Sequence, residues 1–212
     1  MYRNMTSFVN DIDIEEPAEG ENKSIVQPSR SEVKNYLFAA ETFIKPAYKR
    51  IVKLMDLRGD EKVMDFGSGA GPSSNLIANK LKKGKGELTC CDISETWIKV
   101  VKHRFQDLDH VNYLLGDITE MDLPENEYDI ILIHFVLHDI DRETRPAIIK
   151  KLASILKSGG RLIIREPTSG QHGMPVSEIQ ELMTNAGLQG EGLVSRKMMI
   201  FIPVVESIYY KR

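Results

Sequence analysis

A short glycine-rich segment that follows an apolar strand constrains this chain most. It reads Val63-Met64-Asp65-Phe66-Gly67-Ser68-Gly69-Ala70-Gly71, so an acid precedes three glycines at alternate positions. Glycine has no Cβ, and the backbone can therefore turn sharply and approach a ligand closely. A helix beginning at Ser73 or Ser74 would then present unpaired N–H groups in its first turn. The segment predicts a strand–loop–helix unit that holds a nucleotide-like cofactor, and a carboxylate at Asp65 favours a cationic one.

The spacing of the glycines separates two classes of cofactor loop. Dinucleotide-binding loops read G-x-G-x-x-G, whereas the spacing here is G-x-G-x-G. The stretch D-F-G-S-G-A-G resembles the first motif of the class I S-adenosylmethionine-dependent methyltransferases. The resemblance implies that S-adenosylmethionine is the cofactor and that Asp65, Gly67, Gly69 and Gly71 form its binding loop. Taken alone, the loop has an alternative interpretation as a tight turn that binds nothing.

Two later apolar runs, ELTCCD and VNYLLGD, each close on an acid, Asp92 and Asp117. An acid about twenty residues beyond a glycine loop can hydrogen-bond both hydroxyls of a ribose. The family resemblance implies this role for Asp92, with the adjacent Ile93 also at the cofactor. It further implies that Asp117 lies near the adenine amino group and that Ile118 lies under the adenine ring.

The order of the remaining segments predicts the fold. Residues 128–134 are a continuous apolar run, which is typical of a strand buried on both faces. Residues 156–164 (LKSGGRLII) read as a helix end, a glycine stop and a strand, and L-K-x-G-G-x-L is frequent here in the resembling family. Alternating strands and helices predict a parallel sheet with helices on both faces, and two closing strands with a short connection must pair antiparallel. We therefore predict an α/β fold: a Rossmann-like doubly wound sheet, mostly parallel, with seven strands implied by the resemblance and an antiparallel C-terminal hairpin.

The sequence divides the chain into three parts. Residues 1–30 contain six acids between positions 11 and 21; they predict a solvated, mobile arm, with a substrate lid as the alternative. Residues 31–58 carry an apolar stripe with helical spacing. The resemblance implies that this helical part covers the cofactor and shapes the acceptor pocket, whereas packing in the core is the alternative role for its aromatic residues. Residues 59–212 form the predicted methyltransferase core. The aromatic residues considered for the cover are Tyr36, Phe43 and Tyr48.

Three residues near the fourth and fifth strands are candidate catalytic groups. Ligands of open α/β sheets bind beyond the carboxyl ends of the strands, and His134 and Glu166 each follow such a strand. His134 falls where the family places its fourth motif, beside the methyl group, so it is also a candidate cofactor contact. A histidine can act as a base at neutral pH, and His138 would share a helical face with His134. The alternatives are packing for His134 and a helix start at His138.

Neither a metal site nor thiol chemistry is predicted. His134, His138 and Glu166 have the composition of a two-histidine, one-carboxylate site. Metal-dependent catechol-type members of the resembling family use acidic and amide ligands, however, and no Asp-Asn pair follows the fifth strand here. The adjacent Cys90 and Cys91 read as small buried residues of a strand.

Composition narrows the function classes. The chain has 212 residues, 42% of them hydrophobic and 28% charged, with a net charge of −3. This composition predicts one globular core and gives no reason to expect a nucleic-acid or membrane surface. No apolar segment follows the first residues as in a signal peptide, so a cytoplasmic location is expected. We predict methyl transfer to a small-molecule acceptor by in-line displacement. The oligomeric state stays open, as do two other functions, a nicotinamide-dependent oxidoreductase and a cofactor-binding scaffold without catalysis.

Overall fold

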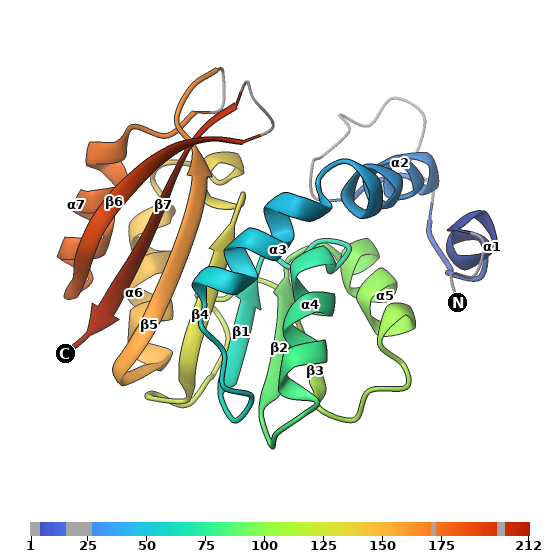
Figure 1. Ribbon diagram of the computed structural model, residues 1–212, viewed down its shortest axis with the longest axis horizontal. Helices are drawn as coiled ribbons and strands as arrows, with labels where there is room; N and C mark the ends of the chain where they lie inside the picture. The colour runs from blue at the N-terminus through green and yellow to red at the C-terminus, as the bar shows by residue number, and fades with distance from the viewer. Residues whose placement is uncertain (1–4, 16–26, 171–172, 199–201) are drawn as a thin grey trace.

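A single seven-stranded sheet organises the chain (Figure 1). The computed structural model describes residues 5–15, 27–170, 173–198 and 202–212. The strands are β1 (Lys62–Phe66), β2 (Glu87–Asp92), β3 (Val111–Leu115), β4 (Tyr128–His134), β5 (Leu156–Pro167), β6 (Leu188–Met198) and β7 (Ile202–Lys211). The helices are α1 (Met5–Asn10), α2 (Arg30–Thr42), α3 (Lys45–Leu54), α4 (Pro72–Leu81), α5 (Glu95–Arg104), the 3₁₀ helix η1 (Leu137–Asp139), α6 (Arg145–Ile155) and α7 (Val176–Asn185).

The strand order, β3-β2-β1-β4-β5-β7-β6, is that of a doubly wound sheet. Strands β1 to β5 pair in parallel, and β7 pairs antiparallel with both β5 and β6. The chain winds outward from β1 to β3 and then returns to place β4 on the other side of β1, so the direction of winding changes between β1 and β4. The predicted fold class is confirmed, including the antiparallel hairpin. Ligands of such sheets bind at this change of direction, beyond the carboxyl ends of the strands.

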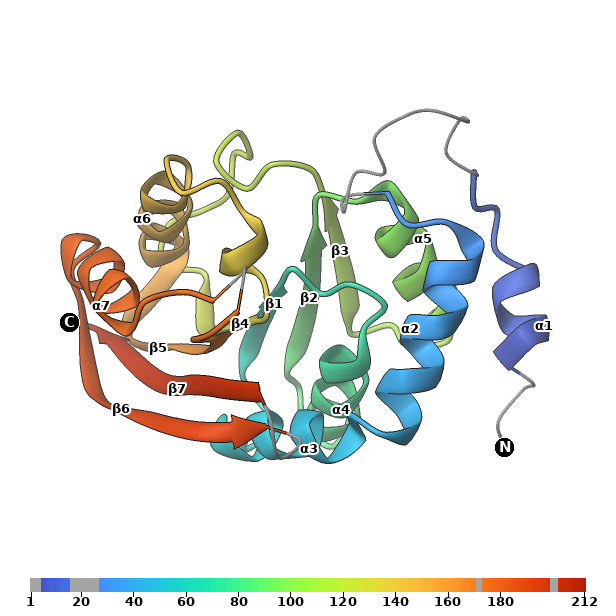
Figure 2. The ribbon, with the colours of Figure 1, turned by 90° about the horizontal axis from the view of Figure 1, so that it is seen from above.

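Helices pack on both faces of the sheet (Figure 2). Helices α6 and α7 bury one apolar cluster with side chains from β1, β4 and β5, whereas α3, α4 and α5 bury another on the opposite face. Alternate residues of β1 point into the two clusters, Met64 into the first and Val63 into the second. The central strands are therefore apolar throughout, as the continuous runs of the sequence indicate. The predicted burial of Cys90 and Cys91 is confirmed, and both are free thiols.

The N-terminal segment differs from the solvated arm expected for residues 1–30. Within the described residues 5–15, α1 packs on α2, and Val9, Ile12 and Ile14 are buried with Val33 and Leu37. The solvated arm was predicted from the many acids between these apolar residues. A short amphipathic turn, however, needs few apolar residues to dock. The rest of the acidic stretch, residues 16–26, lies outside the described residues. The division of the chain into three parts stays a prediction.

Helices α2 and α3 follow the stripe expected for residues 31–58. Ser29 caps α2: its hydroxyl accepts from the backbone N–H of Glu32, and the Glu32 carboxylate accepts in return from the N–H of Ser29. Pro46 lies in the first turn of α3, where its missing N–H costs no hydrogen bond. The closing strands also form as a hairpin of β6 and β7. No helix in the described part of the chain has the length and apolar character needed to cross a membrane.

Candidate cofactor and catalytic site

The glycine loop between β1 and α4 turns through three left-handed residues. The φ angles of Gly67, Gly69 and Gly71 are +70°, +52° and +74°, a region that favours glycine. A Cβ at Gly67 would lie 2.4 Å from a side-chain atom of Val136, and one at Gly71 would lie 2.9 Å from Val101. Around Gly69 the nearest described atom is the Tyr36 hydroxyl at 3.8 Å. Gly67 and Gly71 thus pack inside the protein, and Gly69 faces open space that suits a ligand.

Asp92 fixes the loop from the end of the neighbouring strand. One carboxylate oxygen accepts from the N–H of Gly69 at 2.8 Å, and the other accepts from the N–H of Ser94 at 2.9 Å. Burial raises the pKa of Asp92 above its ordinary value, although these backbone N–H groups act in the opposite direction. Each oxygen keeps a further lone pair for a second donor. The arrangement suits two neighbouring hydroxyls, as on a ribose.

Asp65 is a buried acid beneath the same loop. Its carboxylate accepts a hydrogen bond of 2.5 Å from the hydroxyl of Ser74 in α4. Burial raises the pKa of Asp65 to about 7, and the nearby charge of Asp92 contributes to the rise while the hydrogen bond from Ser74 opposes it. The group is therefore poised to ionise when a cation arrives. This behaviour agrees with the cationic ligand that the sequence favours.

The residues expected around the adenine lie at the ends of β2 and β3. Ile93 follows Asp92, and 54% of its surface is exposed, which leaves an apolar face available for a ring. Asp117 is exposed after β3, and one of its oxygens accepts from the backbone N–H and hydroxyl of Thr119. Ile118 is buried in the cluster beneath α6 and α7. Their roles at the cofactor stay predictions.

Two tyrosines of the N-terminal helices stand over the loop. The hydroxyls of Tyr36 in α2 and Tyr48 in α3 lie 3.1 Å apart. Tyr36 also packs on Trp97, with 5.3 Å between ring centroids, and Tyr48 meets the ring of His134 edge-on at 5.1 Å. Phe43 is 65% exposed between the two helices, and its ring meets that of Phe38 edge-on at 6.0 Å. The tyrosines therefore join the glycine loop to the end of β4.

His134 is held by hydrogen bonds at both ring nitrogens. Nε2 lies 3.2 Å from Nη1 of Arg165, and Nδ1 lies 3.3 Å from the hydroxyl of Ser73. A guanidinium can only donate, so Nε2 accepts, and the proton of the neutral ring lies on Nδ1. Burial, together with the charge of Arg165, holds the pKa of His134 well below its ordinary value. These contacts favour an orienting or packing role for His134 over proton removal.

His138 forms a pair with Glu166. Its Nδ1 lies 2.7 Å from Oε2 of Glu166, while Oε1 accepts from the N–H groups of Val136 and Leu137 at 2.9 and 2.8 Å. Glu166 is fully buried. Burial lowers the pKa of His138, but the hydrogen bond and charge of Glu166 and the charge of Asp139 outweigh it, so the pKa is raised above its ordinary 6.5. With Nδ1 held by Glu166, the proton acceptor of the neutral ring is Nε2, which lies 3.3 Å from Oδ2 of Asp139.

The four-residue spacing of His134 and His138 predicted that they would share a helical face. In the structure the two histidines do not share a helix. Phe135 between them has a φ of +60°, an uncommon conformation for a residue other than glycine. This turn sends His134 toward Arg165 and His138 toward Glu166. The Phe135 ring lies between them, with its centroid 4.9 Å from that of His134 and 6.0 Å from that of His138.

Sequence reasoning missed Ser73, Arg165 and Glu206 as site residues. Ser73 was considered only as a helix start, although its hydroxyl contacts His134. Arg165 donates to Glu206 through Nε and Nη2 at 3.0 and 2.6 Å. Arg165 could have been found from its position at the end of an apolar strand, because a charged residue is rarely buried there without a partner. The partner could not be inferred, since it lies 41 residues further along the chain.

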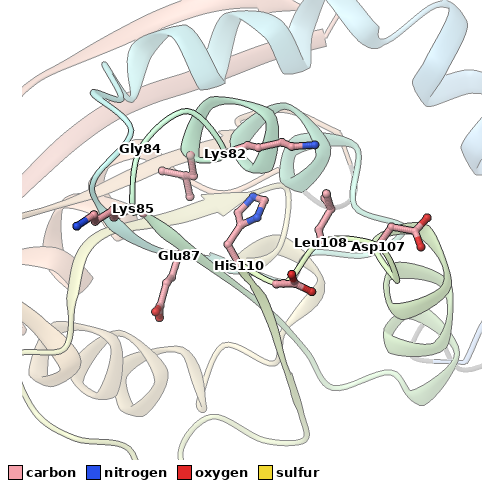
Figure 3. A pocket seen from close by; sticks show the side chains of 10 residues that line it. Lys82, Gly84, Lys85, Glu87, Asp107, Leu108 and His110 are labelled. Carbon is pink, nitrogen blue, oxygen red and sulfur yellow. The ribbon is translucent and has the colours of Figure 1, made fainter.

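A further cavity lies elsewhere, at the opposite edge of the sheet (Figure 3). It has a volume of about 340 Å³ and is lined by the turn after α4 and the segment before β3. Lys82, Lys85 and Asp107 are among the residues that line it, so its walls carry both signs of charge. It does not touch the glycine loop, and ligands of this fold class do not bind at that edge. We therefore assign no cofactor to it. In the described ranges, no three His, Cys, Asp or Glu residues are grouped to hold a metal.

Comparison with known proteins finds similarity to methyltransferases over about half of the chain. Residues 63–160 match the family model of a methyltransferase domain. The ubiquinone/menaquinone biosynthesis C-methyltransferase of Shewanella sediminis is 31% identical over 114 residues, which are 52% of this chain and 44% of that protein. Residues 63–160 of the chain are therefore similar to a methyltransferase domain. It spans about half the length of the curated relatives it matches.

Solved structures of methyltransferases share the fold. A TehB-like methyltransferase of Corynebacterium glutamicum has a TM-score of 0.68 at 18% identity and covers 87% of this chain and all of its own. A methyltransferase of Aquifex aeolicus has a TM-score of 0.67 at 18% identity, covering 84% of this chain and 97% of its own. At this identity the likeness shows the fold alone. The predicted fold is confirmed, and the comparisons favour the predicted methyltransferase family, enzyme class and S-adenosylmethionine cofactor over the oxidoreductase interpretation.

Proposed function

We propose that the protein transfers the methyl group of S-adenosylmethionine to a small-molecule acceptor at the carboxyl ends of β1, β4 and β5. The single observation that carries this proposal is the His138–Glu166 pair next to the glycine loop. Val136, whose backbone N–H binds Glu166, packs with its side chain against Gly67. A candidate base therefore lies on a turn that directly contacts the cofactor loop.

The loop has the features that the cofactor requires. The space at Gly69 can admit the ligand, the two oxygens of Asp92 suit the ribose hydroxyls, and the buried Asp65 suits the ammonium group or the sulfonium. Tyr36 closes the other side of that space. S-adenosylmethionine supplies an electrophilic methyl group on a positively charged sulfur. Holding it in line with an acceptor atom is worth roughly 7–11 kcal/mol of the barrier by positioning alone.

The His138–Glu166 pair suits an acceptor that must lose a proton. His138 Nε2 would take the proton of a hydroxyl, or of a carbon next to one, as the acceptor electron pair forms the new bond to the methyl carbon. The carbon–sulfur bond breaks with its electron pair going to sulfur, which leaves S-adenosylhomocysteine. Glu166 holds His138 in place and stabilises the imidazolium that forms. In this proposal His134 orients groups near the methyl and removes no proton.

The relatives suggest which acceptors to test first. Those matched are named as ubiquinone/menaquinone biosynthesis C-methyltransferases, at 27–31% identity over roughly half of each chain. Ring-hydroxylated aromatic molecules, including hydroquinones, contain the acidic O–H that a histidine base would serve. Tyr36 of α2 packs on Trp97 of α5 beside the open space at Gly69, which offers aromatic surface to such a ring. We propose that the acceptor comes from this class.

The test is methyl transfer from radiolabelled S-adenosylmethionine to a panel of hydroxylated aromatic acceptors. We expect acceptor-dependent formation of S-adenosylhomocysteine, and a fall in kcat of roughly 10²–10⁴-fold in His138→Ala with little change in cofactor affinity. His103→Ala is the matched control, because His103 lies on α5 against Phe8 and outside the site. Equal activity of the His138 and His103 variants would mean that His138 is not the catalytic base. No transfer to any small molecule by a protein that binds S-adenosylhomocysteine would favour the scaffold function.

A further inference from the structure

One buried carboxylate, that of Glu206, is shared by three arginines. Arg165 of β5 donates to it at 2.6 Å and Arg50 of α3 at 3.3 Å, and Nε of Arg196 in β6 forms an ion pair with it at 3.4 Å. Glu206 belongs to β7 and lies opposite Arg165 in the sheet register. Figure 2 shows the ends of β6 and β7 next to α3, which is how three separate elements reach one acid. We refer to these four residues as the arginine cluster.

The arginine cluster carries more positive charge than its carboxylate balances. Arg165 and Glu206 are both buried and form a balanced pair. Four of the five N–H groups of Arg165 are already used, by Glu206, the carbonyl of Ala47 and His134. Within the described ranges, the ion pairs of Arg50 and Arg196 go to Glu206 alone. Two guanidinium charges are therefore left without their own counter-charge, in a chain whose net charge is −3.

The two surplus guanidinium groups face solvent and retain free donors. The side chains of Arg50 and Arg196 are 50% and 45% exposed. Arg50 binds Glu206 through Nε and Nη2, and Arg196 does so through Nε. Each guanidinium has five N–H donors in a rigid fork that matches carboxylate and phosphate oxygens. Their remaining donors can therefore bind one incoming oxyanion, which would also relieve the repulsion between the two cations.

The position of the arginine cluster connects it with the proposed acceptor site. Arg165 touches His134 at the end of β4, and His134 touches Tyr48, whose hydroxyl meets that of Tyr36 above Gly69. Arg196 pairs with Val204, near the start of β7 and on the edge where β4 and β5 end. The surplus charge thus lies beside the acceptor side of the site and away from Asp92, where the ribose is expected.

We propose that Arg50 and Arg196 form an oxyanion-binding site that recognises a carboxylate or phosphate group on the methyl acceptor. This inference rests on the proposed function, because it specifies the chemical class of the acceptor for the same site. The acceptor would carry its anionic group at some distance from the reacting atom. Arg165 and Glu206 hold the two outer arginines in place and do not themselves contact the anion.

The experiment measures the binding of simple anions to the full chain already saturated with S-adenosylhomocysteine. Benzoate and inorganic phosphate are titrated separately by calorimetry at constant ionic strength, so that a carboxylate and a phosphate site are distinguished. We expect one of them to bind, and Arg50→Gln and Arg196→Gln each to weaken that binding about tenfold, as for the loss of a charged hydrogen bond. Arg58→Gln, with a side chain 79% exposed at the far edge of the sheet, should bind the anion as the wild type does.

Each outcome separates the inference from the function on which it rests. Failure to bind S-adenosylhomocysteine contradicts the proposed function, whatever the anions do. Normal binding of S-adenosylhomocysteine without binding of either anion overturns the anion site and leaves the function standing. Anion binding that is unchanged in both variants also overturns it. If Arg50→Gln and Arg196→Gln weaken S-adenosylhomocysteine itself, the arginines hold the carboxylate of the cofactor, and the inference about the acceptor is wrong.

Discussion

At the scale of single residues, the chemistry depends on how Glu166 holds His138. A histidine acts as a base in its neutral form, so the rate should fall as the pH drops below the pKa of His138. Because Glu166 and Asp139 raise this pKa above 6.5 against the effect of burial, the acidic limb of the kcat/KM profile should lie above 6.5. Glu166→Gln removes the buried charge, and we expect its limb to move to lower pH and its kcat to fall. An acidic limb at the same pH in wild type and variant would contradict the pairing of His138 with Glu166.

Asp65 gives a second pH dependence, in the affinity for the cofactor. With its pKa raised to about 7 by burial, the carboxyl is largely neutral below that pH and ionised above it. A cationic ligand favours the ionised form, so affinity should increase as the pH rises through about 7, by at most tenfold per pH unit for one proton. Calorimetry with S-adenosylhomocysteine on both sides of this pH measures the slope. The Asp65→Asn variant should lose this pH dependence of affinity. An equal slope in that variant would mean that another group takes up the proton.

Residue types and spacing allowed only part of this site to be predicted. The acids at strand ends and the three glycines follow from local sequence, because each belongs to one strand and the turn after it. The partners of His134 and His138 do not follow from local sequence. Arg165 and Glu166 point to opposite faces of β5, and their roles depend on the unusual φ of Phe135. No local sequence pattern encodes that turn, whose conformation is maintained by the surrounding tertiary contacts.

At the scale of elements, α1 stabilises the helices that cover the loop. Val9 is fully buried between α1 and α2, and the Arg30 side chain donates to the carbonyls of Val9 and Ile12 at 2.6 and 3.1 Å. Val9→Ala should lower the free energy of unfolding by roughly 1–3 kcal/mol through lost burial and a residual cavity. Urea denaturation measures this, with the exposed Asn10→Ala as control. Equal stability of the two variants would mean that α1 does not dock in solution.

The elements themselves were predictable where their signals were local. Ser94 caps α5 by a local contact, its hydroxyl accepting from the N–H of Trp97 at 3.2 Å, and the apolar runs predicted β1, β2 and β4. The exposed Gly192 weakens the strand pattern around it, although β6 runs from Leu188 to Met198. Docking of α1 was missed because its partner surface is formed by α2 and α5, which lie much later in the chain.

At the scale of the whole molecule, the Arg165–Glu206 pair joins the C-terminal hairpin to the rest of the sheet. Arg165 also donates to the carbonyl of Ala47 in α3 at 2.8 Å, so one buried guanidinium links α3, β4, β5 and β7. Glu206→Gln should lower the free energy of unfolding by about 3–5 kcal/mol, because it leaves the buried charge of Arg165 unbalanced. Denaturant unfolding measures the loss. Glu191→Gln, whose carboxylate accepts from the Tyr210 hydroxyl at an exposed site, should be nearly neutral.

The central claim is that the loop at Gly69 holds S-adenosylmethionine, and a calorimetric titration with S-adenosylhomocysteine tests it most directly. We expect binding in the micromolar range, about −8 kcal/mol, and none in Gly69→Val, whose side chain would fill the open space beside Tyr36. Gly187→Val is the matched control, since Gly187 also has a positive φ and open surroundings but lies between α7 and β6. Micromolar binding by wild type and Gly187→Val, with none by Gly69→Val, is the predicted result. A folded wild-type protein that does not bind, or a Gly69→Val variant that binds as tightly, would contradict the account.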